Sequence, residues 1–169
     1  FRQLKKTLEL MGFENEKKYL HISYGAVRFP WGKMSSRSGE NIIYSSFKEE
    51  LVNLASKEIE NRFKLSKIEL HKRANAIAIA SMKYSMLKQS MNKNVIFDKK
   101  EAIRFEGDTG PYLLYSYARA QSILKKAKYK RADKYKLAKL DEKENSLINE
   151  MGKFPEIVGS SANVLSPHT

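Results

Sequence analysis

The chain has 169 residues, a formal net charge of +13, 41% hydrophobic residues and no cysteine. This composition excludes a disordered chain, disulfides and thiolate metal sites, and the length is enough for one or two domains with a buried core. No apolar run is long enough to cross a membrane. The positive charge predicts a polyanionic partner, with nucleic acid favoured over an anionic membrane surface. The lack of cysteine fits a reducing compartment, so we expect a cytoplasmic protein.

The first elements are predicted to be a helix end, a strand and a turn. Residues 1–12 show an apolar face typical of a helix, which Gly12 would end. Residues 19–29 alternate apolar and polar side chains, which predicts a strand. Gly25 within this strand marks a bend or the close approach of another backbone. The Pro-Trp-Gly sequence at 30–32 is a turn signal.

A cationic loop follows the turn, with the sequence Gly32-Lys33-Met34-Ser35-Ser36-Arg37-Ser38-Gly39-Glu40. Glycines allow backbone turns and close approach to a ligand, while lysine and arginine supply positive charge and hydrogen-bond donors. Hydroxyl and backbone N–H groups can complete the coordination of phosphate oxygens. The loop is therefore either a phosphate-binding element or a solvated connection between a strand and a helix.

The middle of the chain is predicted to be helical. Ser45 and Ser46 are expected to cap a helix over residues 47–63, and residues 65–91 form a second helix whose alanine-rich centre is buried. Residues 92–98 interrupt this pattern with a short extended segment.

The last third predicts a helix from Pro111, which favours a first helical turn, to about Lys128. Residues 147–158 show a final apolar pattern, and the charged residues 141–144 before it are expected to form a solvated cap or loop.

The helix beginning at Pro111 has a face that suits RNA. Tyr112, Tyr115 and Arg119 fall within about 60° of each other around a helical axis. Two rings and a guanidinium can stack on unpaired bases, although aromatic residues in this pattern can equally be core or interface tyrosines. Lys125 and Lys126 follow on the same helix, where they either track an RNA backbone or lie in solvent. Leu113, Tyr117, Ala120 and Leu124 lie on a separate face that is expected to enter a core.

The motifs resemble those of class I aminoacyl-tRNA synthetases, and within that class the arginyl-tRNA synthetases in their archaeal or eukaryotic style. Residues 21–27 with the loop residues 32–37 resemble the second signature of the class. Residues 105–115 with Ala118-Arg119 resemble the entry into the family's helical anticodon-binding domain, and residues 153–158 with the terminal Leu-Ser-Pro-His at 165–168 give a weaker third match.

The resemblance implies a mainly α fold with a short β remnant of a Rossmann-type catalytic domain. Residues 1–46 would be the end of that catalytic domain, residues 47–104 a helical connector, and residues 105–169 the start of an all-helical anticodon-binding bundle. No HIGH-type motif precedes Lys33, so we expect the chain to be a fragment that is inactive alone and truncated at both ends.

The resemblance also implies a reaction and its partners. Arginine would be activated with ATP and Mg²⁺, in the presence of tRNA, and then transferred to the 3′ end of tRNA(Arg). Neither a tightly bound cofactor nor a metal site in the protein is expected, and the complete enzyme would be a monomer. Tyr112, Tyr115, Arg119, Lys125 and Lys126 would bind tRNA.

The loop would hold the catalytic and ATP-binding residues. Catalysis would fall to Lys33, Ser35, Ser36 and Arg37, and ATP binding to Lys33, Met34, Ser35, Gly39 and His21. Alternatively, His21, which lies on the predicted strand, packs against neighbouring residues. The loop departs from the KMSKS pattern because serines stand at 36 and 38 where relatives carry lysines, which leaves the role of Arg37 open.

Two alternative functions stay open. The chain could belong to another class I aminoacyl-tRNA synthetase, which would activate a different amino acid. It could also be a non-catalytic basic helical module that binds structured RNA.

Overall fold

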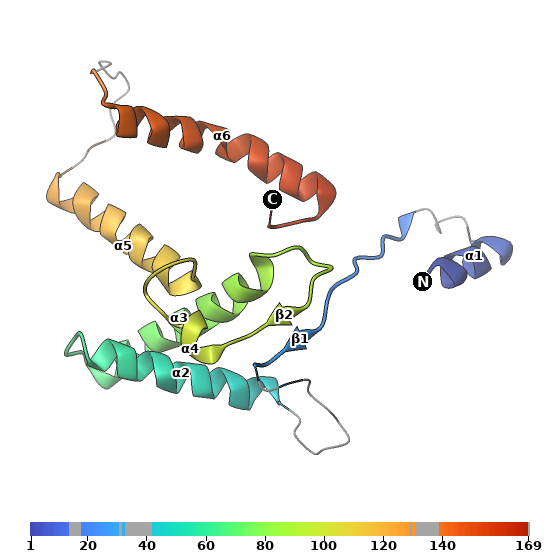
Figure 1. Cartoon of the computed structure of the whole chain (residues 1–169), viewed down its shortest axis with the longest axis horizontal. Helices are drawn as coiled ribbons and strands as arrows, with labels where there is room; N and C mark the ends of the chain where they lie inside the picture. The colour runs from blue at the N-terminus through green and yellow to red at the C-terminus, as the bar shows by residue number, and fades with distance from the viewer. Residues whose placement is uncertain (14–17, 31, 33–41, 129, 131–138, 169) are drawn as a thin grey trace.

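A computed structural model shows a mainly helical chain, as the sequence predicts (Figure 1). The structure describes residues 1–13, 18–30, 32, 42–128, 130 and 139–168. None of the helices in these ranges is both long and apolar enough to cross a membrane. In chain order the elements are α1 (Arg2–Leu10), β1 (Val27–Arg28), α2 (Tyr44–Glu60), α3 (Lys67–Leu87), β2 (Val95–Ile96), α4 (Lys99–Ala102), α5 (Gly110–Lys126) and α6 (Glu142–Val164).

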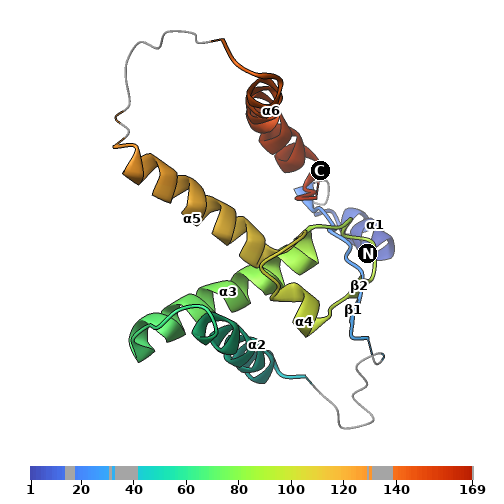
Figure 2. The same ribbon diagram turned by 60° about the vertical axis from the view of Figure 1, so that its left-hand side comes forward.

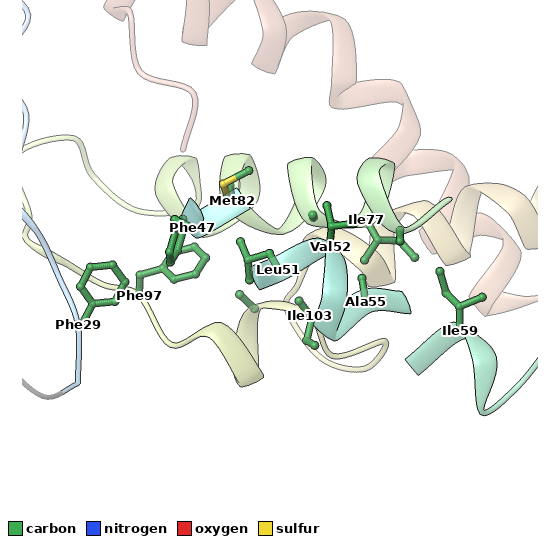
Figure 3. Close-up of a cluster of buried hydrophobic side chains, with 13 residues drawn as sticks. Phe29, Phe47, Leu51, Val52, Ala55, Ile59, Ile77, Met82, Phe97 and Ile103 are labelled. Atoms are coloured by element: carbon green, nitrogen blue, oxygen red, sulfur yellow. The ribbon is translucent and has the colours of Figure 1, made fainter. Parts of the chain in front are cut away.

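The core lies between α2, α3 and the segment that contains α4 (Figure 3). Helix α2 buries side chains at helical spacing, among them Phe47, Leu51 and Ala55, and α3 presents Ala74 and Ala78 to them. Small residues on α3 let the two helices approach closely along their length (Figures 1 and 2). Helix α3 of this pair also contacts α4 and α5.

Three phenylalanines close one end of the core. The rings of Phe29, Phe47 and Phe97 meet edge to face (Figure 3). The ring centroids are 5.5 Å apart for Phe29 and Phe47, 6.4 Å for Phe29 and Phe97, and 5.1 Å for Phe47 and Phe97. Edge-to-face pairs stabilise a core by about 0.5–1.5 kcal/mol beyond their buried area. The cluster joins the segment after β1, the first turn of α2 and the segment after β2.

The strand expected over residues 19–29 is much shorter in the structure, and this prediction was wrong in extent. Only Val27–Arg28 is a strand, paired in parallel with Val95–Ile96. In the described part of the chain no further strand covers the apolar side chains of Leu20, Ile22 and Tyr24, which are exposed. Among the described residues, the alternating pattern therefore has no sheet on which to bury its apolar face.

The close approach expected at Gly25 is confirmed. Its N–H donates to the carbonyl oxygen of Met91 at 2.6 Å, and a Cβ at this position would lie 2.0 Å from the carbonyl oxygen of Lys93. Any side chain larger than hydrogen would push the two backbones apart.

Helix ends match the sequence in part. The expected cap at Ser45 and Ser46 was wrong: α2 begins at Tyr44, three residues before the expected start at Phe47, and the N–H of Phe47 donates to the carbonyl oxygen of Ile43 at 3.0 Å. The expected solvated cap at 141–144 is confirmed as a reciprocal capping box between Asp141 and Glu144. Helices α2, α3 and α5 end three, four and two residues earlier than predicted.

Helix α5 is attached to the core at its first turn. Thr109 caps it, and its buried residues are Gly110 and Pro111. A Cβ at Gly110 would lie 2.3 Å from the carbonyl oxygen of Ala80 on α3. Helix α6 has no buried residue and lies apart from α5 in both views (Figures 1 and 2).

We expect Gly110→Ala to destabilise the chain by about 1–3 kcal/mol, because the added methyl group must displace the α3 backbone. Gly152→Ala in α6 is the matched control, since nothing lies within 4 Å of its added Cβ and alanine favours a helix. Urea unfolding followed by circular dichroism measures both. Equal free energies of unfolding for Gly110→Ala and the parent would contradict the close packing.

Candidate nucleic-acid interface

The predicted phosphate-binding residues of the cationic loop lie outside the described residues. These are Lys33, Met34, Ser35, Ser36, Arg37 and Gly39. The structure describes Gly32 at the start of the loop, where the backbone N–H and carbonyl groups of Gly32 and Phe29 exchange hydrogen bonds of 3.0 and 3.1 Å. The catalytic and ATP-binding roles of the loop stay predictions.

His21 stacks on Phe1. The two rings are 4.3 Å apart at an interplanar angle of 12°. This contact is what the packing interpretation of His21 predicts, and the ATP-binding role of His21 stays a prediction.

The predicted RNA-facing residues come together on α5. The rings of Tyr112 and Tyr115 are 6.3 Å apart, and Nη1 of Arg119 donates to the Tyr115 hydroxyl oxygen at 2.8 Å. Tyr112 and Tyr115 are 43% and 45% exposed, so in the described structure they are surface residues rather than core residues. The hydrogen bond holds the guanidinium beside the Tyr115 ring, so an aromatic ring and a cation are presented together at the surface.

The separate face of α5 that was expected to enter a core is exposed in the part of the chain that the structure describes. Leu113, Tyr117 and Leu124 are 54%, 66% and 43% exposed. Because α5 contacts the core at its first turn, neither face of its later turns is covered there.

Lys125 and Lys126 lie in the last turn of α5. Positive charge there interacts favourably with the helix dipole, which gives these lysines a structural reason for their position. They are 13 and 14 residues beyond Tyr112, or about 20 Å along the helix. The aromatic face and the lysines therefore lie at opposite ends of α5 and cannot bind one nucleotide together.

A set of hydrogen bonds made by Asp108 and Thr109, which we call the latch, fixes the start of α5. Sequence reasoning missed this latch. The Tyr84 hydroxyl on α3 donates to the Asp108 carboxylate, and Nζ of Lys88 donates to the Asp108 carbonyl oxygen at 2.9 Å. The Thr109 hydroxyl donates to the Arg104 carbonyl oxygen at 2.6 Å. The run Glu106-Gly107-Asp108-Thr109-Gly110 was a signal for it, because such polar turns need side-chain partners.

The latch shifts the pKa values of both of its acidic groups, the Asp108 carboxyl and the Tyr84 hydroxyl. The hydrogen bond from Tyr84 lowers the pKa of Asp108, helped by the nearby Lys88 charge. The same bond raises the pKa of Tyr84. A lowered carboxyl pKa stabilises the fold above the unfolded value of about 4 and loses this effect at lower pH. A raised tyrosine pKa stabilises the fold below about pH 10 and loses this effect above it.

We expect Asp108→Asn to lower the stability of the chain at pH 7, and this loss should fade as the pH falls through the lowered pKa of Asp108, where the parent carboxylate becomes protonated. The effect should be small because Asp108 is exposed to solvent. Urea unfolding at a series of pH values measures the gap between variant and parent. The control is Glu156→Gln on the exposed helix α6, and a gap for Asp108→Asn that stays constant as the pH falls would argue against the latch.

Known proteins match this chain over nearly all of its length. A family model described as the DALR anticodon binding domain matches residues 113–169. The arginine–tRNA ligase of Flavobacterium psychrophilum is 35% identical over 170 residues, which cover 99% of this chain and 28% of that protein. The arginine–tRNA ligase of Clostridium acetobutylicum is 42% identical over 129 residues, which cover 75% of this chain and 22% of that protein.

Solved structures agree with these relatives. The Thermus thermophilus arginyl-tRNA synthetase has a TM-score of 0.81 at 29% identity, covering 97% of this chain and 27% of that one. A Plasmodium falciparum arginyl-tRNA synthetase shares the fold, with a TM-score of 0.69 at 20% identity over 96% of this chain and 29% of that one. The higher similarity to bacterial proteins does not favour the archaeal or eukaryotic style expected from the sequence. The chain spans less than a third of the length of these relatives, and it belongs to the arginyl-tRNA synthetase family.

Proposed function

We propose that this chain is part of an arginine–tRNA ligase that activates arginine with ATP and transfers it to tRNA(Arg). The match to named arginine–tRNA ligases over 99% of the chain is the observation that supports this most strongly. In this proposal residues 1–46 end the catalytic domain, residues 47–104 form the connector, and residues 105–169 begin the anticodon-binding domain. The family match at 113–169 falls inside the third range.

The cationic loop would act in the first step of this reaction. As pyrophosphate leaves the α-phosphate of ATP, negative charge builds up, and the cation of Lys33 would stabilise it. Hydroxyl and backbone N–H groups of Ser35 and Ser36 would position the phosphates, with Arg37 as a second cation and ATP arriving as its Mg²⁺ complex. Met34, Gly39 and His21 would complete ATP binding.

The exposed face of α5 would bind tRNA. Tyr112 and Tyr115 offer ring faces at the surface, and Arg119 is already held beside Tyr115 by a hydrogen bond. Stacking of unpaired bases on such rings is the usual way in which proteins hold single-stranded RNA. Lys125 and Lys126 would contact the phosphate backbone farther along the helix.

The alternatives differ from this proposal in measurable ways. Another class I synthetase would catalyse ATP–pyrophosphate exchange with a different amino acid. A non-catalytic RNA-binding module would bind tRNA and support exchange with none. A monomer in the cytoplasm is the state we propose for the complete enzyme.

In the complete enzyme we expect Lys33→Ala to slow arginine-dependent ATP–pyrophosphate exchange by about 10²–10³-fold, because the leaving phosphates lose a cation. The assay contains tRNA, and tRNA affinity should change little. Lys64→Ala, in the exposed connection between α2 and α3, is the control. Exchange at the parental rate in Lys33→Ala would rule out this role of the loop.

We expect Tyr115→Ala to weaken binding of tRNA to the chain about tenfold, because a base loses its stacking surface. Tyr115→Phe keeps the ring and removes only the hydrogen bond with Arg119, so its affinity should stay close to that of the parent. A filter-binding titration measures both variants, with circular dichroism to verify folding. Unchanged affinity of a folded Tyr115→Ala would favour a structural role for this tyrosine.

A further inference from the structure

Two neighbouring clefts lie beside the end of α2: one faces α3 and α5, and the other faces α4 and the segment that follows it. The first, which we call the apolar cleft, has a volume of about 400 Å³ and lies among Phe63, Phe105, Pro111, Leu114, Tyr115 and Ala118. The second, which we call the cationic cleft, has a volume of about 570 Å³ and contains Lys57, Arg62, Lys100 and Arg104. Phe105 borders both clefts.

The apolar cleft presents aromatic surface to solvent. Phe63 is 57% exposed and Tyr115 is 45% exposed, so both rings keep open faces beside the cleft. Arg73 is the charged residue that borders it, and its guanidinium is held by Glu69 at 2.7 Å. An apolar cleft with ring faces and one fixed guanidinium at its edge suits a flat heterocycle such as a nucleobase.

The cationic cleft carries an excess of positive charge. Its four basic residues face two carboxylates, those of Glu58 and Glu106. Arg62 pairs with Glu58 at 3.8 Å, and Arg104 pairs with Glu101 at 2.9 Å. Such exposed pairs are weak, so a phosphate can compete for these cations. Within the described residues, the ammonium groups of Lys57 and Lys100 form neither an ion pair nor a hydrogen bond.

The wall between the clefts is a cation–π pair formed by Arg62 and Phe105. The guanidinium of Arg62 lies over the Phe105 ring, 5.0 Å from its centroid. One side of this wall is apolar and the other side is cationic. A nucleotide has the same division, with a flat base at one end of the ribose and an anionic phosphate at the other.

We propose that the two clefts together bind one unstacked nucleotide of an RNA partner, with the base in the apolar cleft and its phosphate in the cationic cleft. This rests on the proposed function, because it adds a second contact to the tRNA that the α5 face would bind. The excess positive charge favours RNA over an apolar peptide, which would gain nothing from the cations. Tyr115 borders the apolar cleft, so the nucleotide would continue the stacking surface of α5.

The base half of the proposal is tested by filling the apolar cleft. Ala118→Leu places a larger side chain in it from α5, and Ala120→Leu adds the same side chain to an exposed position of α5 outside the cleft. We measure fluorescence anisotropy of labelled oligouridine, which is single-stranded, and of an RNA duplex of equal length. Ala118→Leu should weaken oligouridine binding about tenfold. Duplex binding, and both affinities of Ala120→Leu, should equal those of the parent.

Ala76→Leu, which fills the same cleft from α3 instead of α5, is a second variant. The proposal is overturned if Ala118→Leu and Ala76→Leu bind oligouridine as tightly as Ala120→Leu does. It is also overturned if they weaken duplex binding equally, or if the parent does not bind oligouridine. None of these results affects the proposed function, which depends on arginine-dependent exchange by the complete enzyme.

The phosphate half is tested by the salt dependence of the same binding. Lys100→Ala should reduce the slope of log affinity for oligouridine against log salt by about 0.7, the value for one phosphate contact on a single strand. Lys67→Ala, an exposed lysine at the start of α3, is the matched control and should leave the slope unchanged. Equal slopes for the two variants would contradict the binding of a phosphate in the cationic cleft.

Discussion

The packing of α2 against α3 is the contact on which the rest of the described structure depends. The apolar stripe from Phe47 to Ile59 on α2 is buried largely against α3, which meets it with the small residues Ala74 and Ala78. Chain segments from both sides of this pair then join it. Phe29 brings the segment after β1, and Phe97 brings the segment that leads to α4. The turn before α5 attaches to the outer side of α3. A substitution that separated the two helices would therefore disturb both the approach to the cationic loop and the start of α5.

Local signals in the sequence predicted the elements that depend on neighbours in the chain. The apolar spacing of α2, the run of alanines in α3 and the proline at the start of α5 reflect helix geometry alone, and all three helices are present. Gly25 was identified as a close approach because a glycine inside an alternating segment has few other uses. The prediction of a strand over residues 19–29 was wrong in extent because alternation indicates which face is apolar but not which strand pairs with it. The strand that pairs here, Val95–Ile96, is two residues long.

The features that sequence reasoning missed depend on residues far apart in the chain. The latch joins Tyr84 to Asp108, and the wall between the two clefts joins Arg62 to Phe105. Neither pair has a spacing that indicates contact, because the two residues of each pair lie on different elements that only the tertiary structure brings together. The face made by Tyr112, Tyr115 and Arg119 was predictable for the opposite reason, since one helix brings the three residues together.

Because α5 is attached to the core at its first turn, the displacement caused by a change of its tilt there is largest at its last turn. Its first turn is held by the contact of Gly110 with the backbone at Ala80, and its last residue, Lys126, lies about 25 Å away by helical rise. A tilt of a few degrees at Gly110 moves Tyr112 very little but displaces the last turn by more than an ångström. The rings of Tyr112 and Tyr115 lie nearer this attachment than the lysines do, so the same tilt would move the lysines farther than the rings.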